Sequence, residues 1–140
     1  YIGVNGRMDT LQAAVTLVKL KNFEDEIEKR NDAARLYSEY LNPIVDTPVI
    51  RHENVSTWAQ YTIRTKERDR VRKALELKGI PTAVHYPMPL PKQAAFGYLG
   101  DSRSYPVSEH LADTVLSLPM HAFLSSDDVR SVCDVLKEVL

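Results

Sequence analysis

The sequence predicts an α/β fold in which a long N-terminal helix precedes a small sheet covered by helices. Residues 8–42 contain neither glycine nor proline, which permits a long helical region. After it, short runs of aromatic and β-branched residues alternate with helical repeats, the order typical of a sheet flanked by helices. The 140 residues, of which 44% are hydrophobic, suffice for one buried core, so residues 1–140 are expected to form a single domain.

The N-terminal region carries signals for a helix start and a helix end. Asp9 and Thr10 offer side-chain oxygens to the free amides of a first turn. Pro43 ends the region, because proline clashes with the preceding turn. Apolar residues recur at helical spacing in the first part of this region, at Leu11, Ala14, Val15, Val18 and Leu20. The region can form either one helix or two helices in series with a kink near Lys21.

The remaining chain is predicted to alternate strands and helices. Aromatic and β-branched residues favour strands over residues 58–65, 80–85 and 115–118. Helices are expected over residues 67–78, 93–99 and 107–114, and Gly79 suits the end of the first. A last helix is expected after Ser125, whose hydroxyl suits an N-cap. Its apolar residues, Val129, Val132, Leu136 and Val139, share one face.

Charge and cysteine content exclude several classes of protein. The formal net charge is −1, so neither a nucleic acid nor a membrane is an expected partner. The single cysteine, Cys133, excludes an internal disulfide and a CxxC metal site, and it fits a reducing cytoplasm. The histidine spacing fits no zinc site. The glycine-rich phosphate loop and the G-x-S-x-G motif are both missing from the sequence.

Two polar features are candidate ligand sites. The first is the turn of Asn5 and Arg7, whose guanidinium suits a phosphate or a carboxylate. The alternative there is a plain helix entrance with a solvated arginine. The second is the pair His85 and Tyr86, which ends a predicted strand before Pro87 and can hydrogen-bond a polar ligand. The alternative there is a packed aromatic pair at a turn.

Several segments resemble one enzyme family. Residues 3–14 read GVNGRMDTLQAA and are similar to the segment G-x-N-x-R-[ML]-D-x-[LI]-Q-A-A of the DegT/DnrJ/StrS family. The resemblance continues at residues 79–87, GIPTAVHYP, and at residues 117–121, SLPMH, and it spans essentially the whole chain in order. Members are aminotransferases that use pyridoxal 5'-phosphate (PLP) and act on nucleotide-linked keto sugars. The resemblance implies the C-terminal small domain of a fold-type I aminotransferase.

The resemblance also implies roles for individual residues. Asn5 matches the family asparagine that reaches across a homodimer to the cofactor phosphate. Arg7 matches an arginine that faces the sugar, and His85 and Tyr86 match a pair that lines the sugar pocket. Gln93 is a further candidate on the substrate side. The amino donor implied is glutamate, and the amino sugar is destined for surface polysaccharide or a related glycan.

The family's catalytic lysine lies before the segment that matches residues 3–14. We therefore expect this chain to begin within a larger polypeptide, although a processed or tag-cleaved start is the alternative. The chain alone is expected to lack aminotransferase activity, because it lacks the Schiff-base lysine. Its motifs look most like those of enzymes acting on UDP-linked 3-keto sugars. Some of these use a 2-acetamido uronic acid, whose carboxylate Arg7 would suit.

Two other functions remain open on the sequence. One is a PLP-dependent sugar dehydratase of the same family, in which a histidine replaces the lysine. The other is a non-catalytic interaction domain that forms a stable monomer. An enzyme part would instead expose an apolar face and self-associate. Leu11, Val15 and Val18 are the candidates for that face, unless they pack within the domain.

Overall fold

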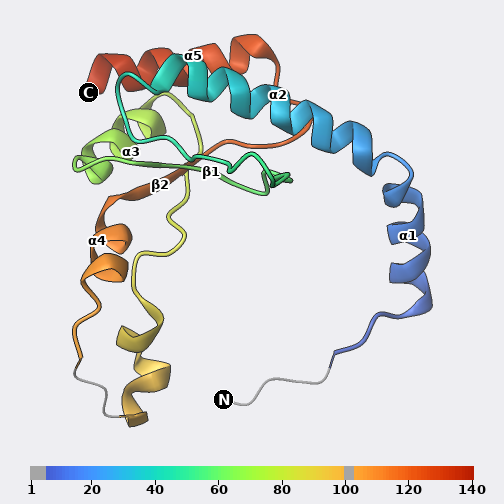
Figure 1. Ribbon diagram of the computed structural model, residues 1–140, viewed down its shortest axis with the longest axis horizontal. Coiled ribbons are helices and arrows are strands. Elements are labelled where there is room, and N and C mark those ends of the chain that lie inside the picture. The colour runs from blue at the N-terminus through green and yellow to red at the C-terminus, as the bar shows by residue number, and fades with distance from the viewer. Residues whose placement is uncertain (1–5, 100–102) are drawn as a thin grey trace.

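The computed structural model describes residues 6–99 and 103–140, and it confirms a fold of helices around a small sheet. In Figure 1, α2 and α5 lie side by side over the sheet, and α3 lies next to α5. The helices are α1 (Thr10–Leu20), α2 (Phe23–Leu41), α3 (Arg68–Leu77), α4 (Pro106–Thr114) and α5 (Ser126–Val139). The strands are β1 (Tyr61–Arg64) and β2 (Val115–Leu118), and two 3-10 helices are η1 (Leu90–Lys92) and η2 (Ala94–Leu99).

The N-terminal region forms two helices in series, which settles the alternative left by the sequence. Asp9 caps α1 as predicted, since its Oδ1 accepts a hydrogen bond from the Gln12 N–H at 2.8 Å. The break comes at Asn22, whose backbone leaves the helical conformation (φ −106°, ψ 4°). The second helix ends at Leu41, two residues before Pro43.

The two strands form an antiparallel pair with one face on the core. Tyr61 lies opposite Leu118, and Ile63 lies opposite Leu116. All four of these side chains are buried beneath the helices. Because strand side chains alternate between faces, Thr62 and its partner Ser117 lie on the other face of the sheet.

The core is built from aromatic and aliphatic side chains of α2, α3, α5 and the sheet. Tyr37 stacks on Tyr61 with ring centroids 4.9 Å apart, and its hydroxyl donates to the Pro119 carbonyl at 3.0 Å. Ser125 caps α5 through a capping box with Asp128, as the sequence predicts. The buried residues of α5 are Val129, Val132, Cys133 and Leu136.

The strand predicted over residues 80–85 is wrong apart from one residue. Only Ala83 pairs with the sheet, through an isolated bridge to Ser117. Pro81 and Pro87 flank this position, and neither has an N–H to extend a ladder. The first predicted strand is also shorter than expected, because Trp58 has a positive φ of 45°. Within the described residues, the sheet therefore has two strands.

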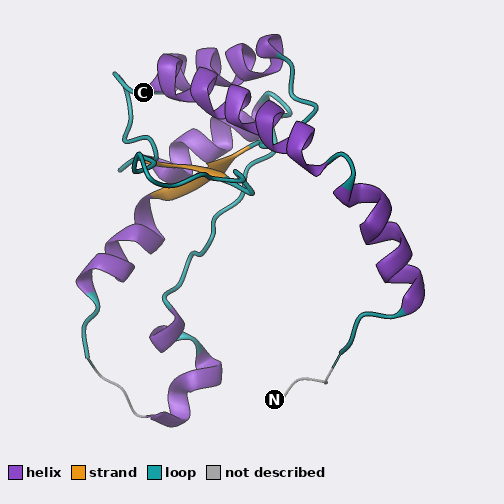
Figure 2. Ribbon diagram, turned by 45° about the vertical axis from the view of Figure 1, so that its right-hand side comes forward, coloured by secondary structure: helices purple, strands orange, loops and turns teal. Residues whose placement is uncertain are grey.

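Two segments extend from this core, and we call them the α1 arm (residues 6–20) and the pocket arm (residues 85–99). Figure 2 shows that they leave the core in different directions. None of their residues is buried. Leu11, Val15 and Val18 are exposed, so the alternative in which they pack within the domain is wrong. No helix in the described ranges has both the length and the apolar character that a membrane span requires.

Candidate functional site

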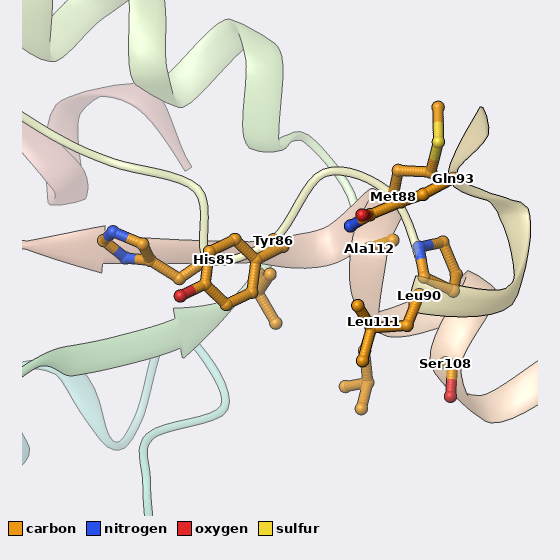
Figure 3. A pocket seen from close by; sticks show the side chains of 10 residues that line it. His85, Tyr86, Met88, Leu90, Gln93, Ser108, Leu111 and Ala112 are labelled. Atoms are coloured by element: carbon orange, nitrogen blue, oxygen red, sulfur yellow. The ribbon is translucent and has the colours of Figure 1, made fainter. Parts of the chain in front are cut away.

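A pocket of about 520 Å³ lies between the pocket arm and α4. Figure 3 shows polar side chains from the pocket arm at its edge and apolar side chains from both elements in its wall. Three residues predicted from the sequence meet here, namely His85, Tyr86 and Gln93. The other lining residues are Met88, Pro89, Leu90, Ser108, Leu111, Ala112 and Val115.

His85 is held by the far face of the sheet. The isolated bridge at Ala83 fixes the backbone two residues before His85. The Ala83 N–H donates to the Ser117 carbonyl at 3.1 Å, and the Ser117 N–H donates to the Ala83 carbonyl at 2.8 Å. The Nδ1 atom of His85 lies 3.2 Å from the Ser117 Oγ. That oxygen in turn lies 2.9 Å from the Thr62 Oγ1. The half-buried imidazole therefore has one ring nitrogen engaged by the sheet.

Tyr86 lies edge-on to His85, with ring centroids 5.5 Å apart and an interplanar angle of 84°. The ring contact agrees with an aromatic pair, but Tyr86 is 70% exposed. In Figure 3 its ring stands between His85 and the apolar wall. Its phenol is therefore available to donate or accept a hydrogen bond at the mouth of the pocket.

Gln93 enters the pocket wall from the end of η1. Its N–H donates to the Leu90 carbonyl at 3.1 Å, and the Lys92 N–H donates to the Pro89 carbonyl at 3.0 Å. Proline restricts the backbone of this turn, so the half-buried amide of Gln93 is carried on a short, stiff element. Among the described residues, the lining contains no aspartate, glutamate, lysine or arginine. It suits a neutral ligand that combines hydroxyl or amide groups with an apolar part.

The structure does not bring Arg7 to this pocket. Arg7 is exposed in the α1 arm and lines a separate groove with Met8, Leu11 and Val15. Figures 1 and 2 agree that α1 lies apart from η1 and η2. Asn5, the residue that resemblance assigns to the cofactor phosphate, lies outside the described residues. Within those residues, the acidic, histidine and cysteine side chains form no cluster suited to a metal ion.

Burial perturbs three ionisable groups of the core. Burial raises the pKa of the Cys133 thiol to about 12. Burial is also the main reason that the pKa values of Tyr37 and Tyr61 are raised. A thiol that stays protonated is a poor nucleophile, so Cys133 has a packing role.

The sequence did not point to the apolar wall of the pocket or to the support for His85. Leu90 and Leu111 meet only because the chain returns through α4, and no local pattern reveals this. Ser117 carries one usable signal, since a serine between apolar residues of a strand faces the opposite side from them.

Comparison with known proteins identifies relatives over nearly the whole chain. The sequence profile of the DegT/DnrJ/EryC1/StrS aminotransferase family matches residues 1–137. One relative is the UDP-2-acetamido-2-deoxy-3-oxo-D-glucuronate aminotransferase of Pseudomonas aeruginosa, 43% identical over 96% of this chain. Another is the dTDP-3-amino-3,6-dideoxy-alpha-D-galactopyranose transaminase of Aneurinibacillus thermoaerophilus, 33% identical over 97% of this chain. The chain spans 37% and 38%, respectively, of the lengths of these two relatives.

Solved structures agree with these relationships. A DegT DnrJ EryC1 StrS aminotransferase from Brucella abortus matches with a TM-score of 0.90 and 42% identity. The match covers 98% of this chain and 37% of that structure. DesV from S. venezuelae, solved in complex with a ketimine intermediate, also gives a TM-score of 0.90, with 32% identity. That match covers 97% of this chain and 38% of the DesV chain.

Proposed function

The chain belongs to the DegT/DnrJ/EryC1/StrS aminotransferase family, and we propose that it forms the sugar-binding C-terminal part of a PLP-dependent aminotransferase. The substrate proposed is a nucleotide-linked keto sugar, which becomes an amino sugar. The observation that carries this proposal is the pocket that unites His85, Tyr86 and Gln93. Imidazole, phenol and amide groups suit the hydroxyls of a sugar.

The pocket does not fit the cofactor itself. Its lining has neither a lysine for the aldehyde of PLP nor an arginine for the phosphate. PLP supplies an electron sink when it is bound, and we place its lysine outside this chain. Asn5 is the one residue here that we propose for the cofactor phosphate. The part of this chain in the reaction is therefore binding and orientation of the sugar.

The geometry suggests how these residues orient a sugar. His85 and Tyr86 offer hydrogen-bonding groups at one end of the pocket, and Gln93 offers an amide on its wall. Leu90 and Leu111 present an apolar surface that excludes water from part of the ligand. Such fixed contacts hold the reacting carbon in one position and so lower the entropic part of the barrier.

Of the two relatives compared above, the one with the higher identity, 43%, is named for a UDP-linked 3-oxo sugar, and this supports UDP-linked 3-keto sugars as the substrate class. The Pseudomonas aeruginosa relative acts on a 2-acetamido glucuronate, which carries a carboxylate. We propose Arg7 as the partner of such a carboxylate and glutamate as the amino donor. Within one chain, Arg7 lies apart from His85. A site that uses both residues therefore favours a homodimer in which the two subunits share each site.

The α1 arm supports the same arrangement. Leu11, Val15 and Val18 are each more than half exposed, and α1 has no buried residue. Exposed apolar patches of this kind mark surfaces for other protein segments. We propose that this face packs against the rest of the enzyme, either the lysine-bearing domain or the partner subunit.

The test is an amine-transfer assay on the complete protein with PLP, glutamate and a UDP-linked 3-keto sugar. We expect an amino sugar as the product. We also expect His85→Ala to lower kcat/KM by about tenfold, in line with the loss of one or two hydrogen bonds. The matched control is His52→Ala, because the His52 side chain is 90% exposed and lies outside the pocket lining.

Three outcomes would contradict parts of the proposal. A dehydrated sugar without a new amine would indicate the dehydratase. If the complete protein neither turns over nor binds the nucleotide sugar, the function that remains is that of an interaction domain. Turnover by the 140-residue chain alone would show that the Schiff-base lysine lies within it, against the proposal.

A further inference from the structure

His85 is supported from behind by two hydroxyl groups of the sheet. Its Nδ1 lies 3.2 Å from the Ser117 Oγ, and that oxygen lies 2.9 Å from the Thr62 Oγ1. Thr62 and Ser117 are directly opposite in the antiparallel register, so their side chains share one face. A line of hydroxyls therefore runs from β1 through β2 to the imidazole.

The backbone of Ser117 is tied to the segment that carries His85. Its N–H donates to the Ala83 carbonyl at 2.8 Å, and its carbonyl accepts from the Ala83 N–H at 3.1 Å. Ser117 is only 4% exposed, so water competes little for its hydroxyl. These contacts together fix the position of the main chain before His85 and the rotation of its ring.

The serine hydroxyl can engage Nδ1 in either tautomer of a neutral imidazole. If the hydroxyl donates to Nδ1, the ring proton lies on Nε2, and if it accepts from Nδ1, Nε2 keeps its lone pair. In both cases the contact occupies Nδ1 and holds the ring in one orientation, so Nε2 is the ring nitrogen left for a ligand. Within the described part of the chain, the structure records no hydrogen bond to Nε2.

We propose that Ser117, supported by Thr62, is a positioning residue that fixes the rotamer of His85 and so presents Nε2 to the ligand. Ser117 does not line the pocket, whereas Val115, two residues earlier on the same face of β2, does. The contact of Nε2 with a sugar hydroxyl rests on the proposed function. The immobilisation of the ring by Ser117 does not.

The test is nuclear magnetic resonance of the 140-residue chain with isotope-labelled histidine. The three-bond couplings of the His85 side chain should report one dominant χ1 rotamer. Ser117→Ala should move these couplings toward those of averaged rotamers, because no hydroxyl then holds Nδ1. Ser117→Thr keeps a hydroxyl and should restore the original couplings. Thr62→Val should cause a smaller change in the same direction.

The matched control is Ser38→Ala. It removes another part-buried hydroxyl pair, between Ser38 and Tyr61 at 2.8 Å, on the opposite face of β1. It should lower stability while leaving the His85 couplings unchanged. Unchanged His85 couplings in folded Ser117→Ala would overturn the proposal. If Ser117→Ala fails to fold, unchanged couplings in Thr62→Val would overturn it.

A kinetic measurement on the complete protein separates this proposal from the proposed function. Ser117→Ala should lower kcat/KM about threefold to tenfold, the range expected for one lost hydrogen bond, and Ser117→Thr should recover most of it. If His85→Ala itself changes nothing, the sugar-binding role fails. The rotamer couplings of His85 would still decide whether Ser117 positions the ring.

Discussion

The core and the two arms differ in what holds them in place. The core side chains of α2, α5 and the sheet are buried against one another, whereas no residue of the α1 arm or the pocket arm is buried. Yet the arms carry four of the described candidate residues, namely Arg7, His85, Tyr86 and Gln93. The core thus provides stability, and the arms present the candidate residues at the surface.

Truncation of a core side chain should give the largest effect. Leu116 is fully buried in β2 between the sheet partner and the helices. Leu116→Ala should lower the free energy of unfolding by about 2–5 kcal/mol, because it removes apolar contacts and leaves a cavity. Leu11→Ala in the α1 arm, where Leu11 is 80% exposed, should change it by less than about 0.5 kcal/mol. Urea unfolding measures both, and equal losses would refute the division into core and arms.

A charge on the apolar face of α1 should weaken self-association. Val15 is 61% exposed. Val15→Lys should raise the dissociation constant of the self-associated chain about tenfold, as expected for the loss of one buried valine. Ala13→Lys adds the same charge on the side of α1 away from Leu11, Val15 and Val18. Sedimentation equilibrium compares the two, and an equal effect would show that charge alone acts.

The two capping boxes offer a comparison between similar motifs in different settings. Ser125 caps α5 in the core, and Asp9 caps α1 in its arm. Ser125→Ala should lower the global free energy of unfolding by about 1 kcal/mol. Asp9→Ala should lose helicity in α1 while leaving global unfolding nearly unchanged. Circular dichroism with urea tests this, and a global loss in Asp9→Ala would mean that α1 is coupled to the core.

Local sequence signals located most elements, and they failed where distant residues decide. The caps at Asp9 and Ser125 and the stop before Pro43 depend on neighbouring residues, so they could be read directly. The register that sets Thr62 against Ser117 joins residues far apart in the chain, and no local pattern fixes it. The same limit explains the strand wrongly expected over residues 80–85, where only Ala83 finds a partner.

The candidate site was predictable only in part for the same reason. Resemblance named His85, Tyr86 and Gln93, and the structure places them around one pocket, although their roles stay predictions. It also named Arg7, but the structure places Arg7 in the other arm. Sequence order does not report which groups meet in space. The apolar wall from α4 and the support from Ser117 needed the three-dimensional fold.

Raising the pH above 9 should gradually lower the free energy of unfolding. Near neutrality, a change of pH should have almost no effect through these groups. Burial raises the pKa of the Cys133 thiol from 9.0 to about 12, and burial likewise raises the pKa of Tyr37 above 10.0. The folded chain keeps these protons where the unfolded chain loses them. Their stabilisation is therefore complete below pH 9 and is lost as the pH rises toward 12. Urea unfolding at a series of pH values tests this, and stability that rises above pH 9 would contradict it.

We propose that this chain supplies the sugar-binding part of an aminotransferase whose Schiff-base lysine lies elsewhere. Reading the coding sequence in frame before the codon for Tyr1 tests this proposal. We expect a continuous reading frame for a domain with a lysine at the position that binds PLP. A histidine at that position would indicate a dehydratase instead. A start codon immediately before Tyr1 would overturn the proposal and leave a binding domain.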